Sequence, residues 1–184
     1  MRRGDPPEAG ASRPRTCLLA LGSNIEPEAN LPRAVAELAG ALSIDGVSRV
    51  YETDPVDAPG TPRFLNAAVA VRWDGTPHRL RAEVLRSIES RMGRVRSGDA
   101  NAPRTIDIDL VLVPGLVLED PAGGLTLPDP ELARRPHLAL PLADVAGAVA
   151  HPLLGASLAD IAARLRSIDG LAIRPDILLA VPPT

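Results

Sequence analysis

Two stretches of the sequence share one order of patterns, in which a strand-like apolar segment is followed by a helical stripe and then by a second strand-like segment. The first stretch runs from 17 to 53 and the second from 64 to 113. A chain of 184 residues has room for one domain with a substantial core. Two such units in one domain favour an α+β fold with a largely antiparallel sheet and helices on one face.

Alternating and helical spacings predict the individual elements. Strands are expected at 17–21, 47–53, 64–73 and from 104 onward, with a short strand within 115–120. The first helix is expected to have Asn30 as its N-cap and Pro32 in its first turn. The second helix is expected at 77–92, capped by Thr76 and ended by Gly93, and a third at 157–166.

Charge and composition disfavour several classes of protein. The net charge of −3 argues against a general nucleic-acid or membrane-surface binder. All 20 cationic residues are arginines, which excludes chemistry that depends on a lysine. The single cysteine, Cys17, rules out an intramolecular disulfide and makes a Cys-based metal site improbable. No Gly-x-Gly-x-x-Gly follows the first strand, so a dinucleotide-binding fold has little support.

The first 15 residues are rich in Pro, Gly and Arg and contain no apolar run. We expect a disordered N-terminal extension at 1–15, with no signal peptide, and a single domain at 16–184. No segment has the length of a membrane span, so a cytoplasmic location without membrane or nucleic-acid partners is expected.

Two acids, Asp107 and Asp109, interrupt an otherwise apolar strand. Strand alternation predicts one face with Ile106, Ile108, Leu110 and Leu112 and an opposite face with Asp107, Asp109, Val111 and Val113. Aspartate is rare in strands, and like charges on one face repel each other. A divalent cation such as Mg²⁺ would offset both costs. Charges that protect an edge strand from aggregation explain this pattern alone about equally well.

Neighbouring residues add a second kind of signal. Arg104 lies three residues before Asp107, and Arg94 and Arg96 begin the preceding loop. These arginines suggest either salt bridges or a clamp on phosphate groups. Phe64 and Asn66 share one face of their strand, where an aromatic ring and an amide could hold a flat heterocycle. Taken alone, this pair is better explained as a core aromatic residue and an asparagine that satisfies local hydrogen bonds.

Five segments together resemble 6-hydroxymethyl-7,8-dihydropterin pyrophosphokinases of folate biosynthesis. They are "LLALGSNIEPEANL", "VYETDPVDAPGTPRFLNAAVAV", "IESRMGRVR", "APRTIDIDLVLV" and "LPDPELARRPHLALPLADV", and the resemblance extends over about 17–165. It implies a ferredoxin-like α+β sandwich, and transfer of pyrophosphate from ATP to the hydroxymethyl group of the pterin with release of AMP. It further implies two Mg²⁺ ions, ATP as co-substrate and the pterin alcohol as acceptor; we expect a monomer.

The resemblance also assigns roles to individual residues. Asp107 and Asp109 would hold the metal ions, and together with Arg94 and Arg104 they form the implied catalytic set. The implied ATP contacts are Arg94, Arg104, Arg135, Glu89 and the position of Asp129. The implied pterin pocket consists of Thr53, Val56, Phe64, Asn66 and the position of His137.

At two of these positions the chain departs from the family pattern. Asp129 stands where a histidine that contacts ATP is common, and His137 stands where an aromatic residue usually forms the second stacking face. An aspartate would repel phosphate unless it faces elsewhere, and imidazole stacks over a smaller area. These departures leave two alternatives open: a paralogue acting on another hydroxymethyl heterocycle, and a pterin- or nucleotide-binding protein with weak catalysis.

Overall fold

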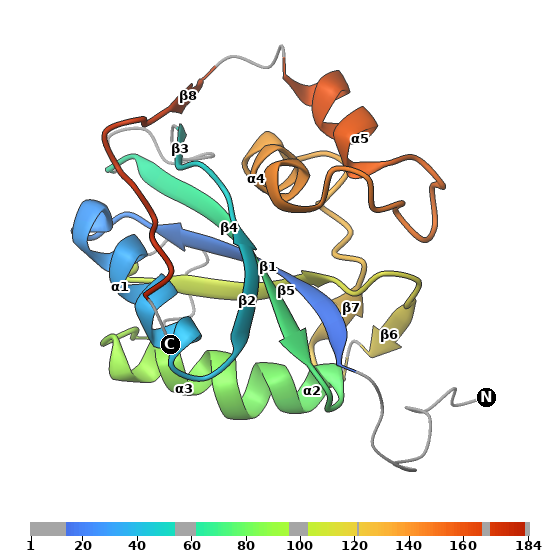
Figure 1. Cartoon of the computed structure of the whole chain (residues 1–184), viewed down its shortest axis with the longest axis horizontal. Coiled ribbons are helices and arrows are strands. Elements are labelled where there is room, and N and C mark those ends of the chain that lie inside the picture. The colour runs from blue at the N-terminus through green and yellow to red at the C-terminus, as the bar shows by residue number, and fades with distance from the viewer. Residues whose placement is uncertain (1–13, 54–61, 96–102, 121, 167–169, 183–184) are drawn as a thin grey trace.

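The computed structural model of the protein describes residues 14–53, 62–95, 103–120, 122–166 and 170–182 (Figure 1). Its main sheet has six strands with the path β5-β1-β4-β3-β8, and β2 also pairs with β4. These strands are β1 (Arg15–Ser23), β2 (Ser43–Val47), β3 (Tyr51–Thr53), β4 (Phe64–Trp73), β5 (Asp107–Leu112) and β8 (Leu171–Ile173). Every pairing between them is antiparallel, which confirms the architecture expected from the sequence.

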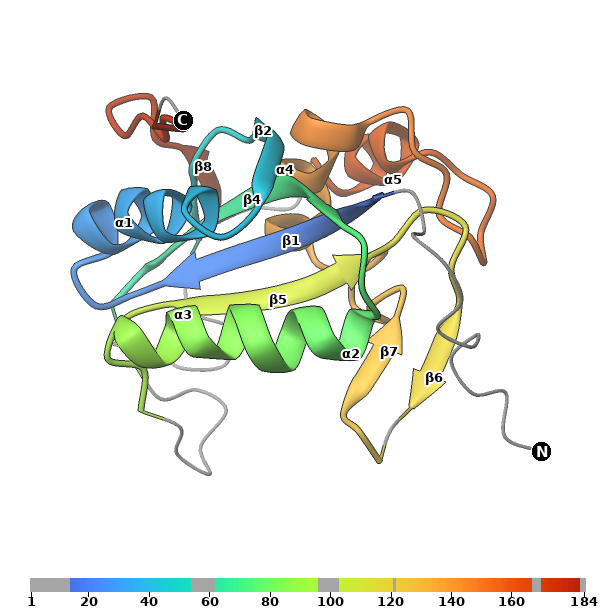
Figure 2. The same cartoon turned by 60° about the horizontal axis from the view of Figure 1, so that its bottom comes forward.

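The helices form two groups. The first comprises α1 (Pro27–Ala39) and a continuous rod made of α2 (Pro77–Arg79), the π-helical η1 (Leu80–Leu85) and α3 (Arg86–Arg91), which runs alongside β5 in Figure 2. The second comprises α4 (Pro136–Ala146) and α5 (Leu158–Leu165). A small hairpin of β6 (Leu118–Asp120) and β7 (Leu125–Leu127) lies beside α2.

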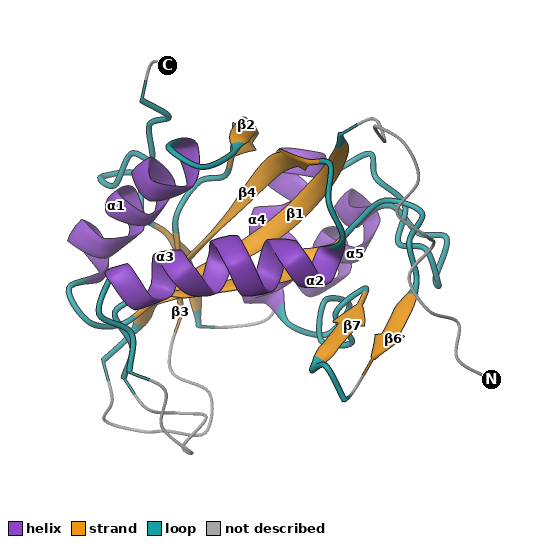
Figure 3. Ribbon diagram, turned by 90° about the horizontal axis from the view of Figure 1, so that it is seen from below, coloured by secondary structure: helices purple, strands orange, loops and turns teal. Residues whose placement is uncertain are grey.

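Alternate side chains of β1 enter two different cores. Leu19 and Leu21 pack with the apolar stripes of α1 and of the rod. The rod passes in front of the sheet in Figure 3. Leu18 and Ala20 pack with residues of α4 and α5. Since neighbouring strand residues point to opposite faces, helices cover both faces of the sheet. The sequence predicted helices on one face of the sheet only. The structure has this layer, formed by α1 and the rod, and a second layer on the other face, formed by α4 and α5.

The second layer was missed because its main helix contains two prolines. Pro136 occupies the first turn of α4, where a missing N–H costs little. Pro141 lies inside the helix and is buried. Packing of Ala139 and Leu142 against the sheet helps to hold this helix despite the interior proline.

The start of α1 differs from the sequence prediction. The helix begins at Pro27, so Asn30 lies inside it and is not its N-cap. The Asn30 side chain instead donates from Nδ2 to the carbonyl oxygen of Ile25, 2.7 Å away. Pro27 at the first helical position was the stronger start signal in this segment.

The predicted strand at 47–53 is divided in two. β2 begins earlier, at Ser43, and β3 starts only at Tyr51. Between them, the Ser48 hydroxyl accepts a hydrogen bond from the Ala68 N–H at 2.8 Å. A side chain therefore takes the place of a backbone carbonyl, and the regular ladder is interrupted.

Strand β5 contains an irregularity that changes its predicted faces. Leu19 pairs with Leu110, whereas Leu18 pairs with Leu112, so Val111 is an extra residue. As a result, Leu112 packs in the core beneath α4 and Val113 in the core beneath α1, the reverse of the expected sides. The prediction was correct for the residues before this bulge, including both aspartates.

Several other predictions are confirmed. Thr76 caps α2 by accepting from the Arg79 N–H at 3.3 Å, and Gly93 follows the rod with φ of 79°. Ser157 caps α5 in a reciprocal box with Asp160.

The N-terminal extension is only partly described. β1 already includes Arg15, while residues 1–13 lie outside the described part, so their disorder stays a prediction. None of the helices described is long and apolar enough to cross a bilayer.

Candidate active site

Three neighbouring strands bring Asn66 and Asp107 onto one face of the sheet. Gly22 of β1 pairs with Asn66 of β4 on one side and with Asp107 of β5 on the other. Directly paired residues face the same way, so all three belong to the α4 side of the sheet. Two strand spacings separate Asn66 from Asp107, roughly 10 Å between their Cα atoms. Gly22 places no side chain between them.

Asp107 is the meeting point of two arginines. Its Oδ1 forms an ion pair with Arg94, and its Oδ2 accepts from Arg104 Nη1 at 2.5 Å. Burial alone would raise the pKa of Asp107, but the two guanidinium groups outweigh it and hold that pKa below its usual value. Asp107 is therefore a carboxylate with cations on both oxygens.

Asp109 has the opposite electrostatic environment. Its residue is exposed to solvent at the surface of the sheet, yet the protein atoms around the carboxyl group desolvate it and raise its pKa to about 7. The negative charges of Asp107 and Glu89 raise that pKa further, and Arg94 offsets them only in part. The pair thus carries excess negative charge at Asp109, where a cation would be stabilised.

Glu89 of α3 holds Arg94 in place through an ion pair. Glu89 is only 3% exposed, and its Oε1 accepts from the Ile108 N–H at 3.0 Å. The same oxygen lies 3.3 Å from Arg94 Nη1, which also donates to the Ile106 carbonyl at 2.8 Å. One buried carboxylate thus joins α3, β5 and the arginine that contacts Asp107.

Arg104 is fixed through its backbone by the turn that follows β1. Asn24 Oδ1 accepts from the Arg104 N–H at 2.7 Å, while the Arg104 carbonyl accepts from the N–H groups of Asn24 and Ile25 at 3.2 and 3.3 Å. Ser23 Oγ donates to the Thr105 carbonyl at 2.6 Å. Arg104 Cζ lies 5.6 Å from the centroid of the Phe64 ring, within cation–π range.

Ser23 and Asn24 are residues that sequence reasoning missed. Their "GSN" sequence lies in the first segment that resembles the family, but no role was assigned to either residue, and only the tertiary pairing with 104–105 gives them one. In the part of the chain that is described, Asn24 Nδ2 and Thr105 Oγ1 are buried without a hydrogen-bond partner. Buried polar atoms normally have one, so these two atoms beside Arg104 depart from the usual pattern.

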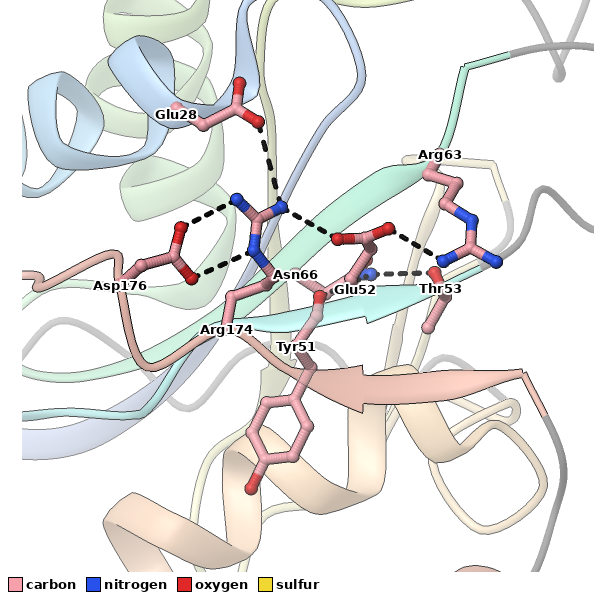
Figure 4. Close-up of polar contacts among 8 residues, drawn as sticks. All are labelled: Glu28, Tyr51, Glu52, Thr53, Arg63, Asn66, Arg174 and Asp176. Atoms are coloured by element: carbon pink, nitrogen blue, oxygen red, sulfur yellow. Dashed lines mark hydrogen bonds and ion pairs between the residues drawn. The ribbon is translucent and has the colours of Figure 1, made fainter.

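The predicted heterocycle residues also come together. Asn66 Nδ2 donates to Thr53 Oγ1 at 2.9 Å, as Figure 4 shows, and more weakly to the Tyr51 carbonyl at 3.4 Å. This places the amide oxygen of Asn66 above Gly22, where an added Cβ would lie 3.6 Å from it. Phe64 shares the face of Asn66 and pairs with Thr53. Val56 lies outside the described residues.

His137 lies in the first turn of α4, on the helix face that packs against β3. Leu140 contacts Tyr51, and Asp144 accepts from the Tyr51 hydroxyl at 2.9 Å. His137 is one turn before Leu140 and so continues this face in the direction of Thr53. Burial, and secondarily the charge of Arg135, lower the pKa of His137 and favour a neutral ring.

In the described part of the chain, the side-chain hydrogen bonds of Arg135 and Asp129 are with Glu131 and do not include Asp107 or Asp109. Arg135 Nε donates to Glu131 at 2.8 Å. The Asp129 N–H donates to the Val111 carbonyl at 2.8 Å, and its Oδ1 accepts from the Glu131 N–H at 2.7 Å. Asp129 therefore lies against β5 with one carboxylate oxygen turned into its own loop, and its charge still contributes to the raised pKa of Asp109.

The chemistry of the acid pair suits Mg²⁺. Among the residues described, no group of three or more His, Cys, Asp or Glu is arranged to hold a metal ion. Mg²⁺ is typically bound by one or two carboxylates, with water and substrate phosphates as its other ligands. Asp107 and Asp109 on one strand face fit that pattern.

Comparison with known proteins connects this geometry to one family. A family model described as 7,8-dihydro-6-hydroxymethylpterin-pyrophosphokinase matches residues 18–147. A curated relative from Methylorubrum extorquens, named as a 2-amino-4-hydroxy-6-hydroxymethyldihydropteridine pyrophosphokinase, is 41% identical over 131 residues, covering 70% of this chain and 80% of the relative. The Bacillus subtilis protein of that name is 37% identical over 130 residues, covering 69% and 75%.

Other matches are to parts of longer proteins. The chain spans only 20% of a folic acid synthesis protein of Dictyostelium discoideum, to which it is 34% identical over 137 residues, or 74% of this chain. Structures of wild-type Plasmodium falciparum HPPK-DHPS with pteroate and with STZ-DHP match with TM-scores of 0.65 and 0.61, both at 14% identity. They cover 85% and 84% of this chain and 43% of each larger chain. These structures confirm the predicted fold class, and the family match shows that this chain belongs to the 7,8-dihydro-6-hydroxymethylpterin pyrophosphokinase family.

Proposed function

We propose that this chain transfers pyrophosphate from ATP to the hydroxymethyl oxygen of 6-hydroxymethyl-7,8-dihydropterin and releases AMP. The observation that carries the proposal is the row Asn66–Gly22–Asp107, because it places an amide suited to a heterocycle beside a cluster of acids and arginines on one surface. In the reaction, the substrate oxygen forms a bond to the β-phosphorus. The bond from that phosphorus to the α,β-bridging oxygen breaks, its electron pair leaves with AMP, and the proton of the hydroxyl passes to solvent water.

Such a transfer needs positioning and positive charge more than covalent chemistry from the protein. Arg94 and Arg104 already converge on one carboxylate, each through one nitrogen, and a guanidinium group can bind phosphate bidentately. Both therefore bind phosphate oxygens of ATP in our proposal, and Arg135 adds a further contact by exchanging Glu131 for phosphate. Glu89 acts on the nucleotide side by holding Arg94.

Asp107 and Asp109 hold two Mg²⁺ ions in this proposal. Mg²⁺, when bound, supplies positive charge to the polyphosphate and polarises the attacking hydroxyl. The excess negative charge around Asp109 supports this assignment. The two arginine contacts of Asp107 also support it. Once a metal ion neutralises this carboxylate, Arg94 and Arg104 can bind phosphate in its place.

The heterocycle binds between Phe64 and His137 in this proposal. The Thr53 hydroxyl accepts from Asn66 Nδ2, which leaves the Asn66 oxygen to accept from an N–H on the edge of the ring. The family resemblance adds Val56 to this proposed pocket. We further propose that the protein acts as a cytoplasmic monomer with small-molecule substrates only.

The direct test is AMP release by the purified chain with ATP, Mg²⁺ and the pterin alcohol. We expect AMP and pterin diphosphate in equal amounts, and loss of both when the pterin is omitted or EDTA is added. Tight binding of pterin and ATP without AMP would instead identify a binding protein. Faster turnover of another hydroxymethyl heterocycle would identify a paralogue with a different substrate.

Replacement of Asp129 by asparagine is expected to improve the use of ATP. The amide keeps an oxygen for the Glu131 N–H but removes a negative charge that acts on Asp109. Since ATP is an anion, its KM should fall about two- to threefold with little change in the KM of the pterin. The matched control is Asp45→Asn, which removes a charge on β2 that is paired with Arg72. An unchanged or higher KM for ATP would show that Asp129 does not repel the nucleotide.

A further inference from the structure

The C-terminal segment contributes a strand to the edge of the sheet, beyond the residues that match the family model. That match ends at 147, whereas β8 extends from Leu171 to Ile173. Tyr51 pairs with Ile173, Glu52 with Ala172 and Thr53 with Leu171. The three-residue strand β3 is therefore paired along both edges, with β4 on one side and β8 on the other.

Arg174 follows β8 directly and joins this strand to its surroundings. Its backbone N–H donates to the Val50 carbonyl at 3.0 Å, just before β3. Its Nη1 donates to Glu52 Oε2 at 2.7 Å, and Nε and Nη2 bind both oxygens of Asp176 at 3.0 and 2.8 Å. A weaker ion pair at 3.8 Å reaches Glu28 in the first turn of α1. Figure 4 shows the guanidinium group among these three carboxylates.

Glu52 connects Arg174 to the candidate pterin pocket, because it binds Arg174 and directly precedes Thr53 in β3. Its side chain is 16% exposed, and its other oxygen accepts from Arg63 at 2.8 Å. The two arginines lower the pKa of Glu52, so it is a carboxylate at neutral pH. Glu52 lies between Tyr51 and Thr53 in the chain and points to the opposite face from them. Its position therefore fixes the backbone that presents Thr53 to Asn66.

The length of β3 explains why such an anchor matters. A strand of three residues has few ladder hydrogen bonds of its own, and the segment that follows it carries the predicted contact Val56. Isolated surface ion pairs contribute little, but here two arginines share one largely covered carboxylate and one of them also binds a second acid. We propose that Arg174, together with β8, is a positioning residue that holds β3 so that Thr53 and Asn66 keep the geometry that binds the heterocyclic substrate. This inference rests on the proposed function, because it assigns the heterocycle to that pair.

The test compares Arg174→Ala, Arg174→Lys and Glu52→Gln in the full-length chain. For Arg174→Ala we expect the Kd and KM of the pterin alcohol to rise about tenfold, while kcat and the KM of ATP stay within about twofold. Arg174→Lys should recover part of this loss, because an ammonium group can pair with Glu52 but cannot also bind Asp176 in bidentate fashion. Glu52→Gln should resemble Arg174→Ala, and the double variant should be no worse than either single variant.

Arg164→Ala is the matched control, because it removes an exposed arginine from α5 in the same C-terminal part of the chain. Its kinetic constants should equal those of the wild type. Amide hydrogen exchange should show faster exchange at 51–53 in Arg174→Ala than in this control. If Arg174→Ala does not fold, the lysine and Glu52→Gln variants carry the same test.

The outcomes separate this inference from the proposed function. A wild type that binds the pterin without releasing AMP would refute the transfer reaction, and the Kd values would still test Arg174. An unchanged Kd for the pterin in Arg174→Ala, or an equal rise in the KM of ATP, would overturn the positioning role. So would unchanged exchange at 51–53. A wild type that binds no pterin would overturn both.

Discussion

Asp109→Asn is expected to lower the rate of AMP release by at least about a thousandfold, because the amide removes a ligand charge from the site that neutralises the polyphosphate. The loss should appear in kcat and should persist at saturating ATP and pterin. Asparagine has nearly the same shape as aspartate, so the change tests charge and not packing. The measurement is a steady-state assay of AMP at increasing Mg²⁺ concentrations.

The same variant should be as stable as the wild type or more stable when metal is removed. Folding raises the pKa of Asp109 from 3.8 to about 7, so the folded state disfavours its ionised form. The unfolded chain ionises this group at lower pH, so the contribution of Asp109 to the stability of the wild type falls as the pH rises from about 4 to about 7. Asparagine has no such titration. In EDTA, the difference in Tm between Asp109→Asn and wild type should grow over this range and then level off.

The control for both effects is again Asp45→Asn, an acid on a strand whose partner, Arg72, lies near the far end of β4 from Asn66. It should keep normal turnover and show no gain in stability. Addition of Mg²⁺ with ATP should raise the Tm of the wild type and not that of Asp109→Asn. Near-normal turnover in Asp109→Asn would refute the metal assignment, and a lower Tm in EDTA would refute the electrostatic account.

Glu89→Ala is expected to destabilise the fold by about 3 kcal/mol. The side chain is 3% exposed, and its removal leaves the buried Ile108 N–H without its acceptor and Arg94 without one of its carboxylates. For a chain of this length, such a loss corresponds to a fall in Tm of roughly 6–12 °C. Activity should also fall below the melting transition, because Arg94 loses the group that orients it toward Asp107.

Glu89→Gln separates the two contributions of this residue. Glutamine keeps an oxygen for the Ile108 N–H but has no charge for Arg94, so we expect a loss of only about 1–2 kcal/mol. The matched control is Glu37→Ala, which removes an exposed ion pair with Arg91 on the same helical rod and should cost less than about 1 kcal/mol. Urea denaturation of the four proteins gives these values. Equal stability of Glu89→Ala and Glu37→Ala would contradict the structural role of Glu89.

Much of the site was predictable from local patterns. The alternation of Asp107 and Asp109 with isoleucines determined which face they occupy, because strand periodicity does not depend on the neighbours. The same reasoning gave the shared face of Phe64 and Asn66, and the preference of threonine for helix N-caps gave the cap at Thr76. The quoted motifs also identified the family, and with it the fold class.

Other features depended on contacts between distant segments. The bulge at Val111, the division of the strand around Ser48 and the helix over 136–146 each depend on a partner that local propensity does not include. Three further features leave no signal in the neighbouring sequence. They are the pairing of Asn24 with Arg104, the burial of Glu89 beneath β5 and the anchoring of β3 by Arg174.

The sequence by itself therefore determined the chemical groups and the faces of the strands on which they lie. Only the tertiary structure decided how these groups are spaced and charged. Spacing is set by the register between strands, with Gly22 between Asn66 and Asp107. The charge state is set by burial and by neighbours from other elements, which is why Asp107 and Asp109, two residues apart on one strand, have pKa values shifted in opposite directions.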